Sequence, residues 1–221
     1  WGGADRPFLT PPPAAPLAEA RALLEDLGAL DHGRITPHGR SLAALPLHPR
    51  LAHMLLVAGS DAAPLAALLE ERDPLRGAPP DLALRLKAIT DLRGYEADHP
   101  WPANRPVLDR IRTEAKRLTR ALSTGAAQAP PQPLSLGQMA ALAYPDRIGL
   151  RRKGDAPRWV LSGGKGAAMA AGTPLAAARL IVATDLDGDA REAQVRQAVA
   201  ISGARRSSPR SIAGLEKSTP T

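Results

Sequence analysis

Apolar residues recur at helical spacing in the first part of the chain. The first run has its members three or four positions apart, at Leu17, Ala20, Leu24 and Leu27. This spacing predicts one apolar helix face, and Gly28 is placed to end the helix. A second helix is predicted after Thr36, because its hydroxyl can cap the backbone and Pro37 suits the first helical position. Residues 1–50 therefore form a compact helical unit with a short extended turn inside it.

A series of short helices separated by Pro, Gly and Asp is predicted after His48. The apolar runs place them at residues 51–58, 64–71 and 82–92. The longest helix is predicted at residues 106–122, where the apolar positions keep the spacing of a single buried seam. The opposite side of that helix carries three cations four residues apart, Arg112, Lys116 and Arg120.

The period of the pattern changes after residues 125–133, which are rich in Pro, Ala and Gln and are interpreted as a linker. A short helix is predicted at 135–143, followed by short, partly alternating segments between Gly, Asp and Pro turns. These strands are predicted at residues 148–152, 158–161, 180–185 and 195–201. Residues 203–221 have no apolar period and many Ser, Arg and Pro residues, so they are predicted to be disordered. The fold class is mainly α, with a small β-rich module at 134–202.

Composition excludes several classes of site and leaves one class of partner open. The 221 residues contain no cysteine, which excludes disulfides, thiolate zinc sites and thiol nucleophiles. The sequence shows no signal-peptide pattern and no apolar run near the roughly 20 residues of a membrane helix, so a soluble, cytoplasmic protein is expected. Lys and Arg number 29 against 22 acids. This excess favours a polyanionic partner, but an arginine-rich surface explains it equally well.

The stretch LSGGKGAAM, residues 161–169, resembles a phosphate-binding loop only superficially. A P-loop needs a glycine five residues before its Gly-Lys pair and a Ser or Thr after the lysine. Here Trp159 lies five residues before Gly164, and Gly166 follows Lys165. The stretch is therefore predicted to form a strand, a turn and a strand.

Two further motifs also favour structural interpretations. DLDGD at residues 185–189 lacks the glycine and glutamate that a calcium loop needs next, since Ala190 and Arg196 stand there. His48 and His53 lack the glutamate and the spacing of a zinc-protease helix. We find no acid-base pair or activated nucleophile, so no catalytic or metal-binding residue is predicted.

The basic residues are the remaining functional signal. A cluster before and within the second predicted strand comprises Arg147, Arg151, Arg152, Lys153 and Arg158. Trp159 follows it, and cations beside an aromatic ring can follow a phosphate backbone and stack a base. The alternative is a solvated charged face. The helical cations Arg112, Lys116 and Arg120 are a weaker second candidate, because helix surfaces are commonly charged.

Long ordered phrases of the sequence resemble the DEAH-box ATP-dependent helicases. In the first half these include FLTPPP, ARALLEDLGALD, ITPHGRSLAALPLHPRLAHMLL and LAALLEERDPLRG. In the second half AYPDRIGLRRKG, RWVLSGGKGAAM and LAAARLIVATDLDGDAREAQVRQAVAI resemble the bacterial HrpB branch of that family. The resemblance runs over nearly all of residues 1–201.

This resemblance implies a specific domain organisation. Residues 1–50 would be the C-terminal half of a winged-helix domain, 51–124 a helical-bundle (ratchet) domain, and 134–202 a β-rich, OB-like C-terminal module. The partners implied are single-stranded RNA or DNA and the helicase motor domains, with ATP and Mg²⁺ as cofactors of the full-length parent. The chain carries none of the motor motifs, so on this resemblance it is inactive alone. A truncated or frame-shifted product is one hypothesis for its boundaries. A scaffold that packs on the motor domains without touching nucleic acid is the alternative function.

Overall fold

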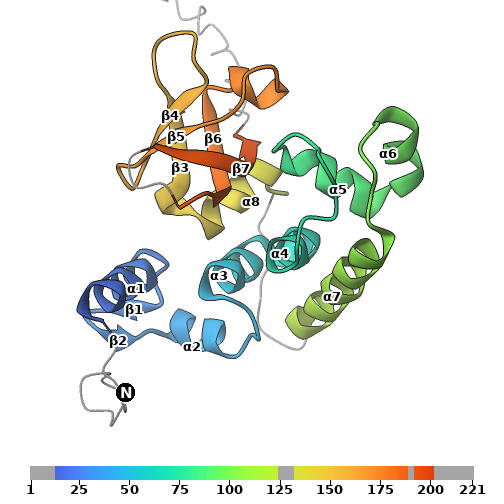
Figure 1. Cartoon of the computed structure of the whole chain (residues 1–221). Helices are drawn as coiled ribbons and strands as arrows, with labels where there is room; N and C mark the ends of the chain where they lie inside the picture. Colours follow the sequence, from blue (N-terminus) through green and yellow to red (C-terminus); the bar gives the residue numbers. More distant parts are fainter. Residues whose placement is uncertain (1–12, 124–131, 189–191, 202–221) are drawn as a thin grey trace, which may run out of the picture.

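A computed structural model describes residues 13–123, 132–188 and 192–201 (Figure 1). The predicted tail at 203–221, most of the predicted linker and the end of the DLDGD turn lie outside the described residues. The described part contains an N-terminal helical unit, a helical bundle and a small β-barrel beside the bundle (Figure 1).

The N-terminal unit contains the two predicted helices joined by a short β-ribbon. Its elements are α1 (Ala14–Asp26), β1 (Leu30–Asp31), β2 (Arg34–Ile35) and α2 (Pro37–Ala43). The turn between the strands uses positive φ angles at His32 (46°) and Gly33 (75°). Thr36 caps α2 as predicted, because its hydroxyl accepts the backbone N–H of Gly39 at 2.9 Å. No residue of α1 is buried, so this helix packs only loosely on the remainder of the unit.

The bundle contains one helix more than the sequence pattern predicted. Its helices are α3 (Pro49–Ala58), α4 (Ala63–Glu70), α5 (Leu82–Thr90), α6 (Leu92–Asp98) and α7 (Arg105–Ser123), with the 3-10 turn η2 (Gly59–Ala62) before α4. The predicted helix at 82–92 is divided at Asp91, whose backbone leaves the helical region. Its carboxylate accepts the backbone N–H of Gly94 at 3.0 Å and so caps α6. Arg85 is buried and holds the loop before α5 through hydrogen bonds to Asp73 and to the Pro79 and Asp81 carbonyls.

One helical stretch, Pro49–Glu70, is long and apolar enough to cross a membrane by length and composition alone. This corrects the expectation that no apolar run approaches that length. However, 67% of its apolar window is buried inside the protein. Its side chains, including Met54, Leu55 and Leu65, form the core of the bundle.

A closed barrel of five strands follows the bundle. After α8 (Leu136–Ala143) and the 3-10 turn η3 (Pro145–Arg147), its strands are β3 (Ile148–Arg151), β4 (Arg158–Leu161), β5 (Gly166–Ala168), β6 (Leu180–Leu186) and β7 (Glu192–Ala200). The order around the barrel is β3-β4-β5-β7-β6, and β6 pairs back to β3. All neighbouring pairs are antiparallel except β5 and β7, which are parallel. The LSGGKGAAM stretch forms β4, a turn and β5, as predicted.

One apolar cluster joins the bundle to the outer side of the barrel. Met139 and Ala140 of α8 pack in the same buried cluster as the bundle helices, together with Val182 and Val199 on the outer side of β6 and β7. The barrel interior is a second cluster, built around Trp159. Because α8 contacts both parts, it fixes the barrel against α3 (Figure 1).

Candidate nucleic-acid interface

Four exposed cations gather at one end of the barrel. The backbone N–H of Arg152 donates to the Arg158 carbonyl at 2.8 Å, and that of Arg151 donates to the Arg179 carbonyl at 2.9 Å. These bonds place Arg158, at the start of β4, and Arg179, directly before β6, on either side of the loop between β3 and β4. The four side chains, Arg152, Lys153, Arg158 and Arg179, are exposed to solvent. We call this group the cationic end of the barrel.

Arg179 was missed by sequence reasoning. It lies far along the chain from Arg152, and only the pairing of β3 with β6 brings the two together. The signal that could have found it is the position of Arg179 directly before a predicted strand, combined with a correct prediction of strand order.

The five cations predicted as one cluster do not form one. Arg151 holds its own loop, since its guanidinium donates to the Asp155 carbonyl at 3.3 Å and its Nε is buried without a hydrogen-bond partner. Arg158 lies 3.4 Å from a carboxylate oxygen of Glu192. Arg147 lies before β3, at the other end of that strand, and donates to the Thr184 carbonyl at 3.0 Å. Arg152, Lys153 and Arg158 are the predicted cations that remain exposed at this end, and Arg158 among them is paired with Glu192.

Trp159 cannot serve as the expected stacking platform. Its side chain is 0% exposed at the centre of the barrel core, and its indole N–H donates to the Ala178 carbonyl at 3.1 Å. The burial alternates along β4, so Arg158 points outward where Trp159 points inward. A base has no access to the ring, and we remove this residue from the candidate site.

The three cations predicted as one stripe on α7, Arg112, Lys116 and Arg120, differ in their contacts. Arg112 donates from Nε to the Ile89 carbonyl at 2.8 Å and from a terminal nitrogen to the Ala88 carbonyl at 3.1 Å. It therefore satisfies carbonyls at the end of α5. Lys116 and Arg120 are exposed, and neither forms an ion pair within the described part of the chain.

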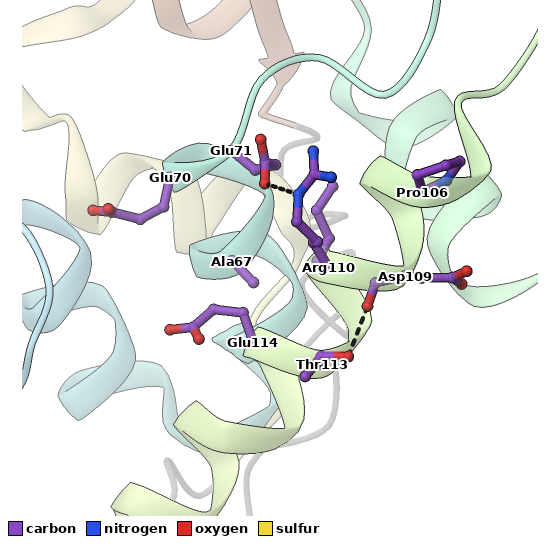
Figure 2. A pocket seen from close by; sticks show the side chains of 9 residues that line it. Ala67, Glu70, Glu71, Pro106, Asp109, Arg110, Thr113 and Glu114 are labelled. Atoms are coloured by element: carbon purple, nitrogen blue, oxygen red, sulfur yellow. Dashed lines mark hydrogen bonds and ion pairs between the residues drawn. The ribbon is translucent and has the colours of Figure 1, made fainter.

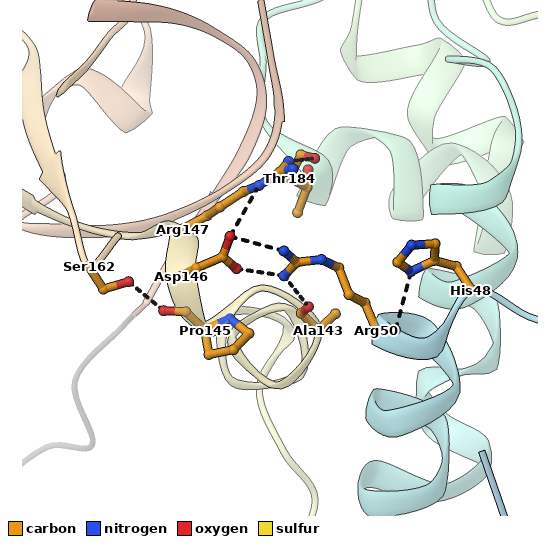
Figure 3. Close-up of polar contacts among 8 residues, drawn as sticks. All are labelled: His48, Arg50, Ala143, Pro145, Asp146, Arg147, Ser162 and Thr184. Atoms are coloured by element: carbon orange, nitrogen blue, oxygen red, sulfur yellow. Dashed lines mark hydrogen bonds and ion pairs between the residues drawn. The ribbon is translucent and has the colours of Figure 1, made fainter. Parts of the chain in front are cut away.

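A polar junction joins the bundle to the barrel (Figure 3). Arg50 of α3 forms two hydrogen bonds with the carboxylate of Asp146, at 2.5 and 3.0 Å, and a third with the Ala143 carbonyl at the end of α8. Partial burial raises the pKa of Asp146, but the hydrogen bonds and charge of Arg50 outweigh it and hold that pKa below its ordinary value. This junction is structural, because the Arg50 guanidinium is occupied by these partners.

A hollow of about 300 Å³ beside the junction mixes charges of both signs. Arg50 and Arg147 lie over the ring of Tyr144, with centroid distances of 5.3 and 5.0 Å. Glu70 lines the same hollow. Burial and then the nearby Arg50 lower the pKa of His48, so this histidine adds little positive charge near neutral pH. The hollow is therefore a poor path for a phosphate backbone.

The hollow between α4 and α7 is acidic (Figure 2). It measures about 500 Å³ and is lined by Glu70, Glu71, Asp109 and Glu114. Its one cation, Arg110, donates from Nε to Glu71 at 2.8 Å. Carboxylates repel phosphate, which leaves the cationic end of the barrel as the more suitable surface for a polyanion.

The possible metal ligands among the described residues include the histidines. No group of three or more His, Cys, Asp or Glu side chains is arranged to hold a metal ion in that part of the chain. His53, predicted to be structural, hydrogen-bonds to His38 with a nitrogen-to-nitrogen distance of 2.9 Å. His48 caps α3 by accepting the backbone N–H of Arg50.

Comparisons with known proteins show which proteins this chain resembles. Residues 20–47 match the winged-helix part of the helicase-associated domain (HA2). The ATP-dependent RNA helicase HrpB of Escherichia coli (strain K12) is 31% identical over 191 residues, which is 83% of this chain and 21% of that protein. The crystal structure of the E. coli DExH-box NTPase HrpB superposes with a TM-score of 0.66 and 28% identity over 88% of this chain and 22% of that one. The chain is similar to one region of the HrpB helicases.

The match to HrpB covers one region of a much longer protein, since the chain spans about a fifth of the relative's length. A shorter match joins 57 residues, at 46% identity, to the probable ATP-dependent RNA helicase DHR1 of Saccharomyces cerevisiae, over 25% of this chain and 4% of that protein. The winged-helix match lies within residues 1–50, where the sequence resemblance predicts the C-terminal half of a winged-helix domain.

Proposed function

We propose that this chain is the accessory region of an HrpB-type DEAH-box RNA helicase and that it binds single-stranded nucleic acid without sequence preference. The observation that carries the binding proposal is the gathering of Arg152, Lys153, Arg158 and Arg179 at one end of the barrel. Such cations neutralise phosphates and release counterions, which gives affinity independent of sequence. In the full-length parent, the motor domains with ATP and Mg²⁺ would supply the chemistry, and the cytoplasm would be the compartment.

We further infer that the barrel is of the OB type. Five strands close in an order in which the third and fifth are parallel and all other neighbours are antiparallel. OB barrels bind oligonucleotides on the face of their second and third strands and on the loops between strands one and two and between four and five. Here the first of these loops contains Arg152 and Lys153, which supports the proposed binding surface.

Titration of a labelled single-stranded RNA, followed by fluorescence anisotropy at low and moderate salt, tests the proposal. We expect binding that weakens steeply with salt. Because each phosphate contact with a single strand contributes about 0.7 to the log-log salt slope, the double variant R152A/K153A should bind several-fold more weakly with a slope shallower by about 1.4. The control R21A/R34A removes the same charge from exposed positions of the N-terminal unit and should bind nearly as the wild type does.

A second candidate function has one observation in its favour. Leu150 and Val160 are paired on adjacent strands of the barrel and are 51% and 41% exposed, which makes an apolar strip on its outer face. Such a strip suits a protein contact, as the scaffold interpretation requires. Absence of RNA binding by the wild-type chain at low salt, with the protein shown to be folded by circular dichroism, would favour the scaffold.

A further inference from the structure

Three rings lie in a row at the start of the loop between α6 and α7. The rings of Tyr95 and His99 have centroids 5.0 Å apart, and those of His99 and Trp101 are stacked at 5.8 Å with planes 25° apart. Tyr95 is buried, and its hydroxyl donates to the Trp101 carbonyl at 2.9 Å. This bond ties the loop to the bundle and fixes the position of Trp101.

Exposure decreases along this row toward the bundle interior. Tyr95 is fully buried, whereas His99 and Trp101 are partly exposed. Trp101 is thus the opposite of Trp159, whose ring is enclosed. An aromatic ring that is already stacked on one side and reaches solvent is a pre-ordered platform, so little side-chain entropy is lost when a ligand stacks on it.

Polar groups converge beside the same loop. The Arg76 backbone N–H donates to the Pro102 carbonyl at 3.3 Å, and that of Asn104 donates to the Pro74 carbonyl at 2.8 Å. The two loops therefore run side by side and place Arg76 next to the segment that carries Trp101. They border a hollow of about 410 Å³ whose polar lining consists of Arg76, Asn104 and Arg105.

The charged residues that line this hollow, Arg76 and Arg105, are cations, which favours an anionic ligand. Arg76 forms no ion pair within the residues that the structure describes. The carboxylates nearby on α6 already have cationic partners, because Glu96 binds Arg105 at 3.0 Å and Asp98 binds Lys87. The contrast is with the hollow between α4 and α7, where carboxylates predominate.

We propose that the α6–α7 loop is a second contact for single-stranded nucleic acid, with one nucleobase stacked on Trp101 and a neighbouring phosphate bound by Arg76. Asn104 can hydrogen-bond the sugar or a phosphate oxygen from the same hollow. A stacked base joined to a paired phosphate suits a single strand rather than a duplex, because the bases of a duplex are stacked on each other. The inference rests on the proposed function in that RNA is its ligand, but it uses a different surface.

Tryptophan emission and RNA affinity together test this contact. The experiment uses the full chain with Trp1→Phe, so that Trp101 and the buried Trp159 are the emitters, and titrates it with a 12-nucleotide oligouridylate. Emission from Trp101 should be quenched on binding, and the quenching should vanish in W101Y. Since stacking of one base is worth about 1–3 kcal/mol, W101L should lower RNA affinity about 5-fold to about 140-fold. W101Y should keep most of the affinity, and R76A should lower it several-fold.

The outcomes separate this contact from the cationic end of the barrel. One outcome overturns the inference: RNA binds and R152A/K153A weakens the binding, but W101L leaves the affinity unchanged and RNA quenches the emission equally with and without Trp101. The row of rings would then only close the bundle over Tyr95. If W101L and R76A weaken binding while R152A/K153A does not, the contact stands and the barrel surface fails. Absence of RNA binding by the wild-type chain overturns both. Thermal melting of W101L and W101Y checks that lost affinity is not lost folding.

Discussion

Arg50 of α3 binds the segment that leads from α8 into the barrel. Its side chain is only 12% exposed, and its guanidinium satisfies both oxygens of Asp146 and the Ala143 carbonyl. Replacement by alanine leaves these acceptors without their donor. Because hydrogen bonds to charged groups contribute about 1.5–3 kcal/mol, R50A should lower the free energy of unfolding by about that amount at pH 7, measured by urea denaturation. R50K keeps the charge but loses the paired geometry and should recover only part of the loss.

The effect of R50A should depend on pH with a definite sign. The pKa of Asp146 is depressed in the folded protein, so its contribution to stability is present above the ordinary value of 3.8 and is lost as the pH falls through the lower folded value. The difference in unfolding free energy between wild type and R50A should therefore be constant from pH 7 to about 5 and shrink below about pH 4. A difference that stayed constant down to pH 3 would show that Asp146 is not the partner that matters.

Trp159 illustrates how a residue's environment reverses a sequence prediction. The prediction of a stacking platform followed from its position beside Arg158, but strand alternation places adjacent residues on opposite faces of the sheet. Truncating a buried large aromatic side chain costs about 3–5 kcal/mol, so W159A should lower the melting temperature sharply. Any loss of RNA affinity in W159A should accompany unfolding, whereas W101L should lose affinity while folded.

At the scale of elements, α7 shows what spacing can and cannot predict. The apolar seam predicted the helix to within a residue or so at each end, because three-four spacing alone determines which side faces the core. The same spacing placed Arg112, Lys116 and Arg120 in one stripe. Their roles differ because Arg112 bonds to carbonyls of α5, a contact between elements that no pattern within α7 contains.

Substitutions along α7 should reveal this difference. R112A removes the hydrogen bonds to the Ala88 and Ile89 carbonyls and should lower the free energy of unfolding by about 1–3 kcal/mol. K116A and R120A remove exposed cations and should change it by less than about 0.5 kcal/mol. Urea denaturation of the three variants measures this directly, and equal stability of all three would mean that the Arg112 bonds contribute nothing.

The barrel strands were predictable as elements but not as an assembly. Alternation and turn residues located β3, β4, β6 and β7 and the β4–β5 hairpin, since these signals are local. The parallel pairing of β5 with β7 and the closure of β6 onto β3 join segments that are distant in sequence. For that reason the sequence did not predict Arg179 as part of the candidate site. The row of rings ending at Trp101 was missed likewise, because the sequence around it reads only as a turn.

At the scale of the whole molecule, the bundle and the barrel are held together by an apolar cluster to which both contribute. Val182 and Val199 of the barrel pack with α8 and with bundle residues such as Leu55, so separating the two parts would expose apolar surface on both. The Arg50–Asp146 pair crosses the same boundary. We therefore expect the bundle and the barrel to unfold together.

Two probes can follow the two parts separately in one urea titration. Far-ultraviolet circular dichroism reports mainly the helices of the bundle, and in the W1F/W101F variant the emission of Trp159 reports the barrel interior alone. Coincident transitions with one midpoint are expected, because a shared core couples the two parts. The variant V182A/V199A removes methyl groups from the apolar contact between the two parts and should lower the urea midpoint of both probes equally. Two resolved midpoints in the parent variant would instead mean that the barrel folds independently and that α8 belongs to only one of the parts.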